Sequence, residues 1–185
     1  MSSKPKPVSR IGGVSEAAGD PILADIFAHI LARRGHILNI HQVVAHSPKM
    51  LRAQAAYASS MREDSILPRD LQELLILRVA QVNGSEYEQS VHRPIALACG
   101  ASLEKIEALP GWANSPAFDA RERAALAFVD QGAGSGEIHD AAFAAAAELF
   151  SSREMVEIAT LVAWYVGNSR FVRMMRIAPQ DGAAS

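Results

Sequence analysis

One stretch of the sequence, residues 73–92, constrains the fold and the function of the chain more than any other. Its first half belongs to a segment from Leu71 to Val82 that is apolar on almost every side. This segment ends at Asn83-Gly84. A helix that is apolar all round is the buried helix of its domain. The residues after the break are polar and predict the start of a second helix. We therefore expect two consecutive helices, joined by a tight turn, at the centre of the protein.

The rest of the sequence also predicts helices, and no segment has the alternating pattern of a strand. Apolar residues recur at helical spacing, and several segments begin with a capping residue or a proline, as at Asp20-Pro21 and Ser47-Pro48. A glycine-rich loop near residues 132–136 should separate two of the helices. The predicted helices cover about residues 21–34, 39–45, 48–64, 69–82, 86–99, 105–109, 119–129, 140–150 and 151–175. This pattern predicts an all-α fold of eight or nine helices with short loops.

Length and composition favour a single domain. The chain has 185 residues, of which 49% are hydrophobic and 21% are charged, values that are ordinary for a globular protein. Residues 1–13 are rich in Pro, Ser and Gly and predict an extended N-terminal arm. We expect one domain over residues 14–178 and a loose tail over residues 179–185.

Several functional classes are disfavoured by the charge and the residue usage. The net charge is -2 and no basic stripe is present, so nucleic-acid binding is not indicated. No apolar run has the roughly 20 residues that a membrane span requires, and the N-terminus lacks the apolar core of a signal peptide. The single cysteine, Cys99, cannot form an internal disulfide and suits a reducing compartment. We therefore expect a cytoplasmic protein that contacts neither nucleic acid nor membrane.

The predicted second helix begins with residues of an acid–base site. Ser85, Glu88 and His92 are spaced by three and four positions, which places them on one face of the helix. A carboxylate beside an imidazole forms a general-base unit. Glu73, on the apolar helix, should be desolvated, which makes it a candidate proton donor or relay. Backbone N–H groups at residues 85–87 open a helix and could bind a carboxylate or an enolate.

Each of these residues also has a purely structural interpretation. Ser85 and Glu88 match the S-x-x-E capping box, in which the glutamate bonds back to its own helix start. Tyr87 is either a phenolic donor or a packing residue. His41 and Trp164 are candidate pocket walls from other helices. His36, His41 and His46 recur every five residues, which spreads them around a helix, so we predict no metal site.

The central stretch resembles a known protein family. The residues that carry the resemblance are Leu67-Pro68, the pattern ELLILRVAQVNGSEYE at 73–88, His92 and IALACG at 95–100, followed by ERAALAFVD and the last segment from SSREMVEIATLVAWYVGNSRF. They resemble the carboxymuconolactone decarboxylase family, which includes the alkyl hydroperoxidase D (AhpD) type. The resemblance covers about residues 10–177. It implies an all-α bundle built on a helical hairpin, with protomers that associate into dimers, trimers or hexamers.

This chain departs from the hydroperoxidase members at the positions that matter for redox chemistry. Those members have a Cys-x-x-Cys motif, a histidine four residues after the second cysteine and a glutamate twelve before the first. The resemblance assigns the glutamate to Glu73, the histidine to His92, and the two cysteine positions to Ser85 and Glu88. Peroxide reduction by that route needs a thiolate and a resolving thiol, so we expect no thiol peroxidase activity.

The decarboxylase branch of the family uses no cysteine pair, metal or organic cofactor. The resemblance therefore implies cofactor-free acid–base chemistry, of the lyase, decarboxylase or isomerase type, on a small carbonyl or carboxylate compound. We expect His92 to be the general base, Glu88 its orienting partner and Glu73 an acid or relay. Contacts to the substrate are expected from Ser85, Tyr87, His41 and Trp164.

Two other functions remain open at the level of sequence. One is an AhpD-type relative that has lost its redox activity. The other is a non-catalytic protein that binds a small molecule or serves assembly.

Overall fold

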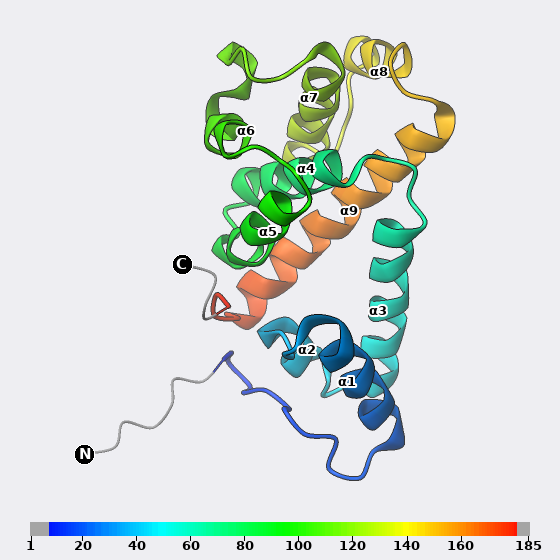
Figure 1. Ribbon diagram of the computed structural model, residues 1–185, viewed down its shortest axis with the longest axis vertical. Helices are drawn as coiled ribbons and strands as arrows, with labels where there is room; N and C mark the ends of the chain where they lie inside the picture. The colour runs from blue at the N-terminus through cyan, green and yellow to red at the C-terminus, as the bar shows by residue number, and fades with distance from the viewer. Residues whose placement is uncertain (1–7, 181–185) are drawn as a thin grey trace, which may run out of the picture.

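The structure is a computed structural model that describes residues 8–180, and this part of the chain is all-helical (Figure 1). The all-α prediction is confirmed. Within the described residues there are nine α-helices, one short 3-10 helix and no strand. Their bounds are α1 Pro21–Arg34, α2 Asn39–Val44, α3 Pro48–Glu63, α4 Arg69–Val82, α5 Glu86–Ala98, α6 Leu103–Ala108, the 3-10 helix η1 Leu109–Asn114, α7 Ala120–Gly134, α8 Asp140–Ala147 and α9 Ser152–Met175.

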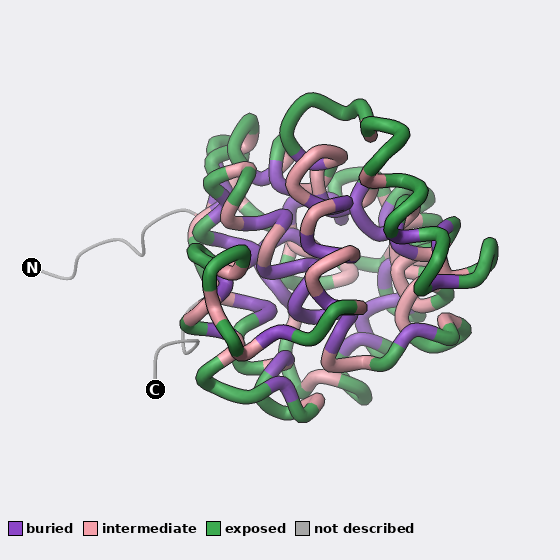
Figure 2. Tube along the Cα trace, turned by 90° about the horizontal axis from the view of Figure 1, so that it is seen from above, coloured by how far each residue is buried: buried purple, intermediate pink, exposed green. Residues whose placement is uncertain are grey.

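Helix α4 is the buried centre of the larger of two hydrophobic clusters. It packs against α5, α7 and α9, and every residue from Leu71 to Ala80 except Arg78 is buried, as its apolar sequence predicts. Buried residues of α6, α7 and α9, including Ile106, Leu126 and Ile158, complete this cluster. Buried segments lie inside the molecule and exposed segments outside, as Figure 2 shows from above. None of the described helices is both long and apolar enough to cross a membrane.

The smaller hydrophobic cluster lies at the end of the molecule that contains α1 and α2. It joins α1 and α2 to the first half of α5 and the end of α9, through residues such as Phe27, Val43, Tyr87, Val91 and Val172. Helix α3 connects the two ends and stands to one side of α9 (Figure 1). Only Leu51 of α3 is buried, so this helix spans the molecule without filling the space between the two clusters.

The described parts of both chain ends pack against the smaller cluster. The Arg10 N–H donates to the Met175 carbonyl at 3.0 Å. Residues 179–180, where we predicted a loose tail, are held instead: the Asn39 side chain donates to the Pro179 carbonyl, and the Gln180 N–H donates to Ser90 Oγ at 3.2 Å. The other tail residues, 181–185, and residues 1–7 of the predicted arm lie outside the described part of the chain.

Helix α7 is longer than the sequence indicates. We predicted that it ends near residue 129 and that a loop surrounds Gly132, but the helix continues to Gly134. A Cβ atom at Gly132 would lie 3.2 Å from the side chain of Val162 in α9. Gly132 therefore allows α7 and α9 to approach closely, and tertiary packing outweighs the low helix propensity of glycine here.

Candidate active site

The hairpin between α4 and α5 brings the predicted site residues together. Its turn depends on Gly84, whose φ of +60° favours a residue without a side chain. Ser85 follows; its N–H donates to the Ala80 carbonyl at 2.8 Å, and its Oγ accepts the Glu88 N–H at 3.4 Å. Ser85 is therefore the N-cap of α5.

Glu73 of α4 and His92 of α5 form a short buried contact. Glu73 Oε2 lies 2.7 Å from His92 Nδ1, and the other oxygen, Oε1, accepts from Arg69 Nη2 at 2.8 Å. Glu73 is fully buried, and Arg69, one helical turn earlier, compensates its charge. Arg69 also donates to Gln72, which in turn donates to the Leu67 carbonyl. This network fixes the carboxylate that holds the imidazole.

The contact with Glu73 determines which nitrogen of His92 is available for chemistry. A carboxylate only accepts hydrogen bonds, so the proton of the neutral imidazole lies on Nδ1. The free Nε2 then lies on the side of Glu88, where Glu88 Oε2 is 3.5 Å away. That distance is longer than a hydrogen bond.

Glu88 is a buried carboxyl group with an oxygen that has no partner. Only 3% of Glu88 is exposed, and its Oε1 lacks a hydrogen bond. Burial raises the pKa of Glu88, the nearby charge of Glu73 raises it further, and His92 opposes the rise. Because the Ser85 N–H is bonded to Ala80, Glu88 does not complete the capping box. Its carboxyl group is free for His92 and for a ligand.

The contacts of the two carboxylates with His92 therefore differ from those that the sequence predicted. We expected Glu88, four residues before His92 on the same helix, to be its hydrogen-bonded partner. Glu73 makes this contact instead. Spacing along one helix shows which side chains are neighbours, but the closer partner comes from the packing of α5 against α4.

A cavity of about 620 Å³ lies between the two hydrophobic clusters, bordered by α1, α2, α3, the start of α4, α5 and α9. This volume is within the range of small-molecule sites. Its lining includes Glu88 and His92, together with three residues predicted to contact a substrate: His41, Tyr87 and Trp164. Glu73 lies behind His92 and does not line the cavity. Ser85 does not line it either, which corrects our expectation that Ser85 contacts a substrate.

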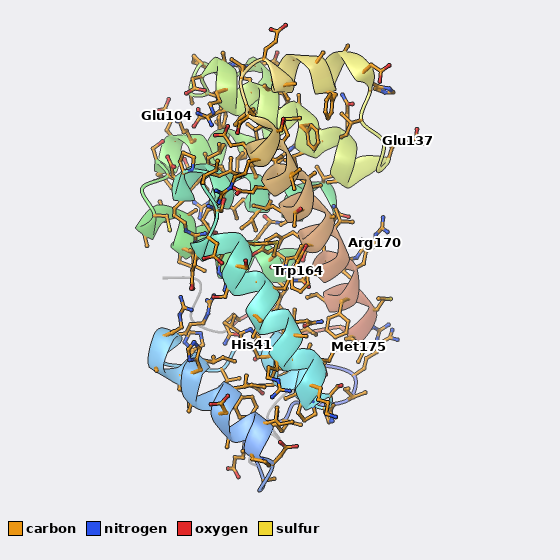
Figure 3. All side chains as sticks on the ribbon, turned by 90° about the vertical axis from the view of Figure 1, so that its right-hand side faces the viewer. His41, Glu104, Glu137, Trp164, Arg170 and Met175 are labelled. Atoms are coloured by element: carbon orange, nitrogen blue, oxygen red, sulfur yellow. The ribbon has the colours of Figure 1, made fainter. Side chains whose placement is uncertain are left out.

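Aromatic residues of α9 form one wall of the cavity. Tyr165 meets the His92 ring edge to face, with 5.0 Å between the ring centres and an angle of 89° between the planes. Trp164 packs against Tyr57 of α3, with ring centres 4.9 Å apart. Figure 3 labels Trp164 where α3 crosses α9 and His41 nearer the α1–α2 end. Burial raises the pKa of Tyr165, which keeps its phenol protonated.

Tyr87 and His41 line the cavity as uncharged side chains. The Tyr87 hydroxyl accepts the backbone N–H of Ile40 at 3.1 Å, and burial raises its pKa. This bond gives Tyr87 a structural role, since it ties α5 to α2. Burial, followed by the charges of Arg34 and Arg62 and by His36, lowers the pKa of His41 to about 4. His41 is thus neutral at pH 7, and its buried Nδ1 has no partner.

Four further polar residues at this site were not predicted from the sequence. Arg69 and Tyr165 contact the carboxylate and the imidazole of the central pair, and Arg34 and Arg62 line the cavity. Arg69 had a detectable signal, because it precedes Glu73 by four positions. The two other arginines had none, because they lie on helices far from residues 73–92 in the sequence.

Residues 8–180 contain no group of three or more His, Cys, Asp or Glu side chains arranged to hold a metal ion. Cys99, the single cysteine of the chain, follows the end of α5 and is not part of the cavity lining.

Comparison with known proteins finds a family model that matches part of the chain. Residues 48–131 match the model of the carboxymuconolactone decarboxylase family. No curated protein sequence matches the chain.

Several solved structures share the fold. An uncharacterized peroxidase-related protein from Ralstonia eutropha JMP134, described as an alkylhydroperoxidase AhpD core, has a TM-score of 0.84 at 23% identity, with 96% of this chain and 95% of that chain covered. A peroxidase-related protein from Silicibacter sp. TM1040 has a TM-score of 0.81 at 20% identity, with 98% and 96% covered. The debrominase Bmp8 in complex with 2,3,4-tribromopyrrole also gives 0.81 at 20% identity, with 92% of each chain covered.

The family match spans α3 to most of α7 and includes Glu73, Ser85, Glu88 and His92. The structural matches extend over nearly the whole chain. Residues 48–131 therefore match the carboxymuconolactone decarboxylase family model, and the chain has an AhpD-like fold.

Proposed function

We propose that the protein is a cofactor-free acid–base enzyme that acts on a small carbonyl or carboxylate compound in the cavity beside His92. The observation that carries this proposal is the setting of His92. Its Nδ1 is held by Glu73, while Nε2 lies beside Glu88 at a cavity of about 620 Å³. An imidazole oriented by a carboxylate, with its second nitrogen free, is a general base.

In the proposed reaction His92 Nε2 removes a proton from the carbon next to a carbonyl group, or assists the loss of carbon dioxide from that carbon. Either step leaves an electron pair on the substrate as an enolate. A proton donor must then complete the reaction at carbon. Glu88 suits this role because burial raises its pKa and one of its oxygens has no partner.

Glu73 has a positioning role in this scheme. It does not line the cavity, and its two oxygens are occupied by His92 and Arg69. When His92 takes up a proton, the carboxylate stabilises the imidazolium. We therefore assign orientation of the base to Glu73 and proton exchange to Glu88, the reverse of the sequence-based roles.

A screen of small β-keto acids and lactones for carbon dioxide release, and for deuterium uptake in heavy water, tests this proposal. Once a substrate is found, His92→Ala and Glu73→Gln are expected to lower turnover by about 10² to 10⁴-fold, the usual contribution of a general base. His46→Ala is the matched control, because His46 is an exposed histidine outside the cavity lining. Unchanged turnover in both His92→Ala and Glu73→Gln would show that the assignment is wrong.

Two alternatives give different results in the same assays. A relative of the hydroperoxidases would consume peroxide with a dithiol donor and lose this activity in Cys99→Ser. We expect no such activity, because Cys99 is not part of the cavity lining and is the single thiol of the chain. A non-catalytic protein would bind small molecules in the cavity but turn none of them over.

The remaining features of the proposal concern the state of the protein in the cell. We propose that residues 14–178 act as one domain, that the chain forms a homo-oligomer and that it works in the cytoplasm. The resemblance of the sequence to an oligomeric family supports the second point. The single cysteine supports the third.

A further inference from the structure

The end of α1 and the end of α3 meet at the edge of the cavity and bring four charged residues together. Arg33 of α1 forms an ion pair with Glu63 of α3, which joins the two helix ends. The adjacent residues, Arg34 and Arg62, are both half-buried, and both line the cavity. The two guanidinium groups thus come from different helices and border the same space.

These two arginines lack the carboxylate partners that Arg33 and Arg69, two other arginines of the cavity, have. Arg33 is paired with Glu63, and Arg69 is paired with Glu73. Within residues 8–180, neither Arg34 nor Arg62 forms an ion pair with a carboxylate. Fully buried charges are normally paired, whereas these two half-buried cations keep their charge available to a ligand in the cavity.

Together with burial, the positive charges of Arg34 and Arg62 lower the pKa values of neighbouring groups. Burial lowers the pKa of Arg34, and the charge of Arg62 lowers it further. The same two arginines act with burial to hold His41 in its neutral form, with a buried Nδ1 that has no partner. An anion between these residues would relieve the repulsion and satisfy hydrogen-bond donors that are otherwise unused.

The arginines are also connected to the proposed reaction centre. Arg62 lines the same cavity as Tyr165, whose ring packs against His92. Both arginines, His41, Glu88 and His92 line the same cavity. A ligand that spans this cavity could therefore contact the arginines at one end and His92 at the other.

We propose that Arg34 and Arg62, with neutral His41 beside them, form an anion-binding subsite that takes a carboxylate group of the substrate. This group orients the molecule so that its reacting carbon faces His92 and Glu88. The inference rests on the proposed function in that both require a small molecule in this cavity, and it narrows the substrate to an anionic compound.

A structural role for these arginines leads to a different expectation. Arg34 lies in the last turn of α1, where a cation interacts favourably with the helix dipole. Such a role stabilises the helix but gives no preference for an anionic ligand. The two interpretations therefore differ in ligand binding, which is measurable without an enzyme assay.

The experiment compares benzoate with benzamide, which have almost the same shape and differ in charge. Binding to the full chain is measured by calorimetry and by ligand-observed NMR. We expect the protein to prefer benzoate, and we expect Arg34→Gln and Arg62→Gln each to weaken benzoate binding about tenfold or more, as the loss of a charge-assisted hydrogen bond does. The double variant Arg33→Gln/Glu63→Gln is the matched control, since it removes the neighbouring ion pair without changing the net charge, and it should bind benzoate like the wild type.

The outcomes separate this inference from the proposed function. Equal binding of benzoate and benzamide, or equal loss of benzoate binding in Arg33→Gln/Glu63→Gln, would overturn the subsite. Circular dichroism and urea unfolding of each variant identify any loss that comes from unfolding. Benzoate binding that persists in His92→Ala supports the subsite whether or not His92 proves to be a catalytic base.

Discussion

Glu73 and His92 lie on different helices, 19 positions apart in the sequence, and their side chains meet with 2.7 Å between Oε2 and Nδ1. The contact is buried and is backed by the ion pair of Glu73 with Arg69. It determines the orientation of the imidazole, and with it which nitrogen faces Glu88. The first prediction follows from this relationship.

Replacing Glu73 by glutamine should change the tautomer of His92. In the wild type the carboxylate accepts from Nδ1, so the proton of the neutral ring is held on that nitrogen. The glutamine can present its NH₂ group to Nδ1, which favours the proton on Nε2. Nitrogen-15 NMR of the His92 ring distinguishes the two forms. Glu88→Gln is the control and should keep the proton on Nδ1, and the same tautomer in Glu73→Gln would contradict the assigned role.

Replacing Glu88 by glutamine should change how stability depends on pH. Burial raises the pKa of Glu88 above its ordinary 4.5, so the folded protein holds this proton more tightly than the unfolded chain. The associated stabilisation is complete below pH 4.5 and is lost as the pH rises through the folded pKa. Glu88→Gln has no proton to lose. Urea unfolding across a pH series should therefore show that the free energy of unfolding of the variant, relative to the wild type, rises with pH above 4.5. A constant difference between the two proteins would refute the prediction.

His41 should make the protein sensitive to mild acid. Its pKa is 6.5 in an ordinary setting and about 4 in the fold, so between these values the unfolded chain binds the proton more strongly. Stability contributed by the neutral ring is present above pH 6.5 and is lost as the pH falls towards 4, by up to about 3 kcal/mol. His41→Gln should flatten the unfolding free energy over this range. His46→Gln, at an exposed histidine, should leave the slope as in the wild type.

Removing the Tyr87 hydroxyl should destabilise the fold. The hydroxyl accepts the N–H of Ile40, and both groups are buried, so Tyr87→Phe leaves a buried donor without a partner. The expected loss is about 1 to 3 kcal/mol in the free energy of unfolding, measured with urea. Tyr57→Phe is the comparison, since Tyr57 is 45% exposed and its substitution should have little effect. Equal stability of wild type and Tyr87→Phe would mean that water replaces the lost partner.

Much of the fold was predictable because its signals are local. The all-round apolar pattern of α4 identified the central helix, and Asp20-Pro21 and Ser47-Pro48 identified helix starts. Errors arose where packing between helices outweighs local preference. Gly132 lies inside α7 because it allows close contact with Val162, and the side chain of Gln180 accepts the N–H of Asn39, where we predicted a loose tail.

The sequence by itself determined that residues 73–92 form two central helices, that Glu73, Glu88 and His92 are the candidate acid–base residues, and that Ser85 and Glu88 occupy the cysteine positions of the AhpD type. Tertiary structure alone decided that Glu73 holds His92, that Ser85 is a helix cap outside the cavity lining, and that Arg34 and Arg62 border the cavity. The physical reason is that spacing defines the faces of a single helix, whereas distances between side chains on different helices depend on how those helices pack.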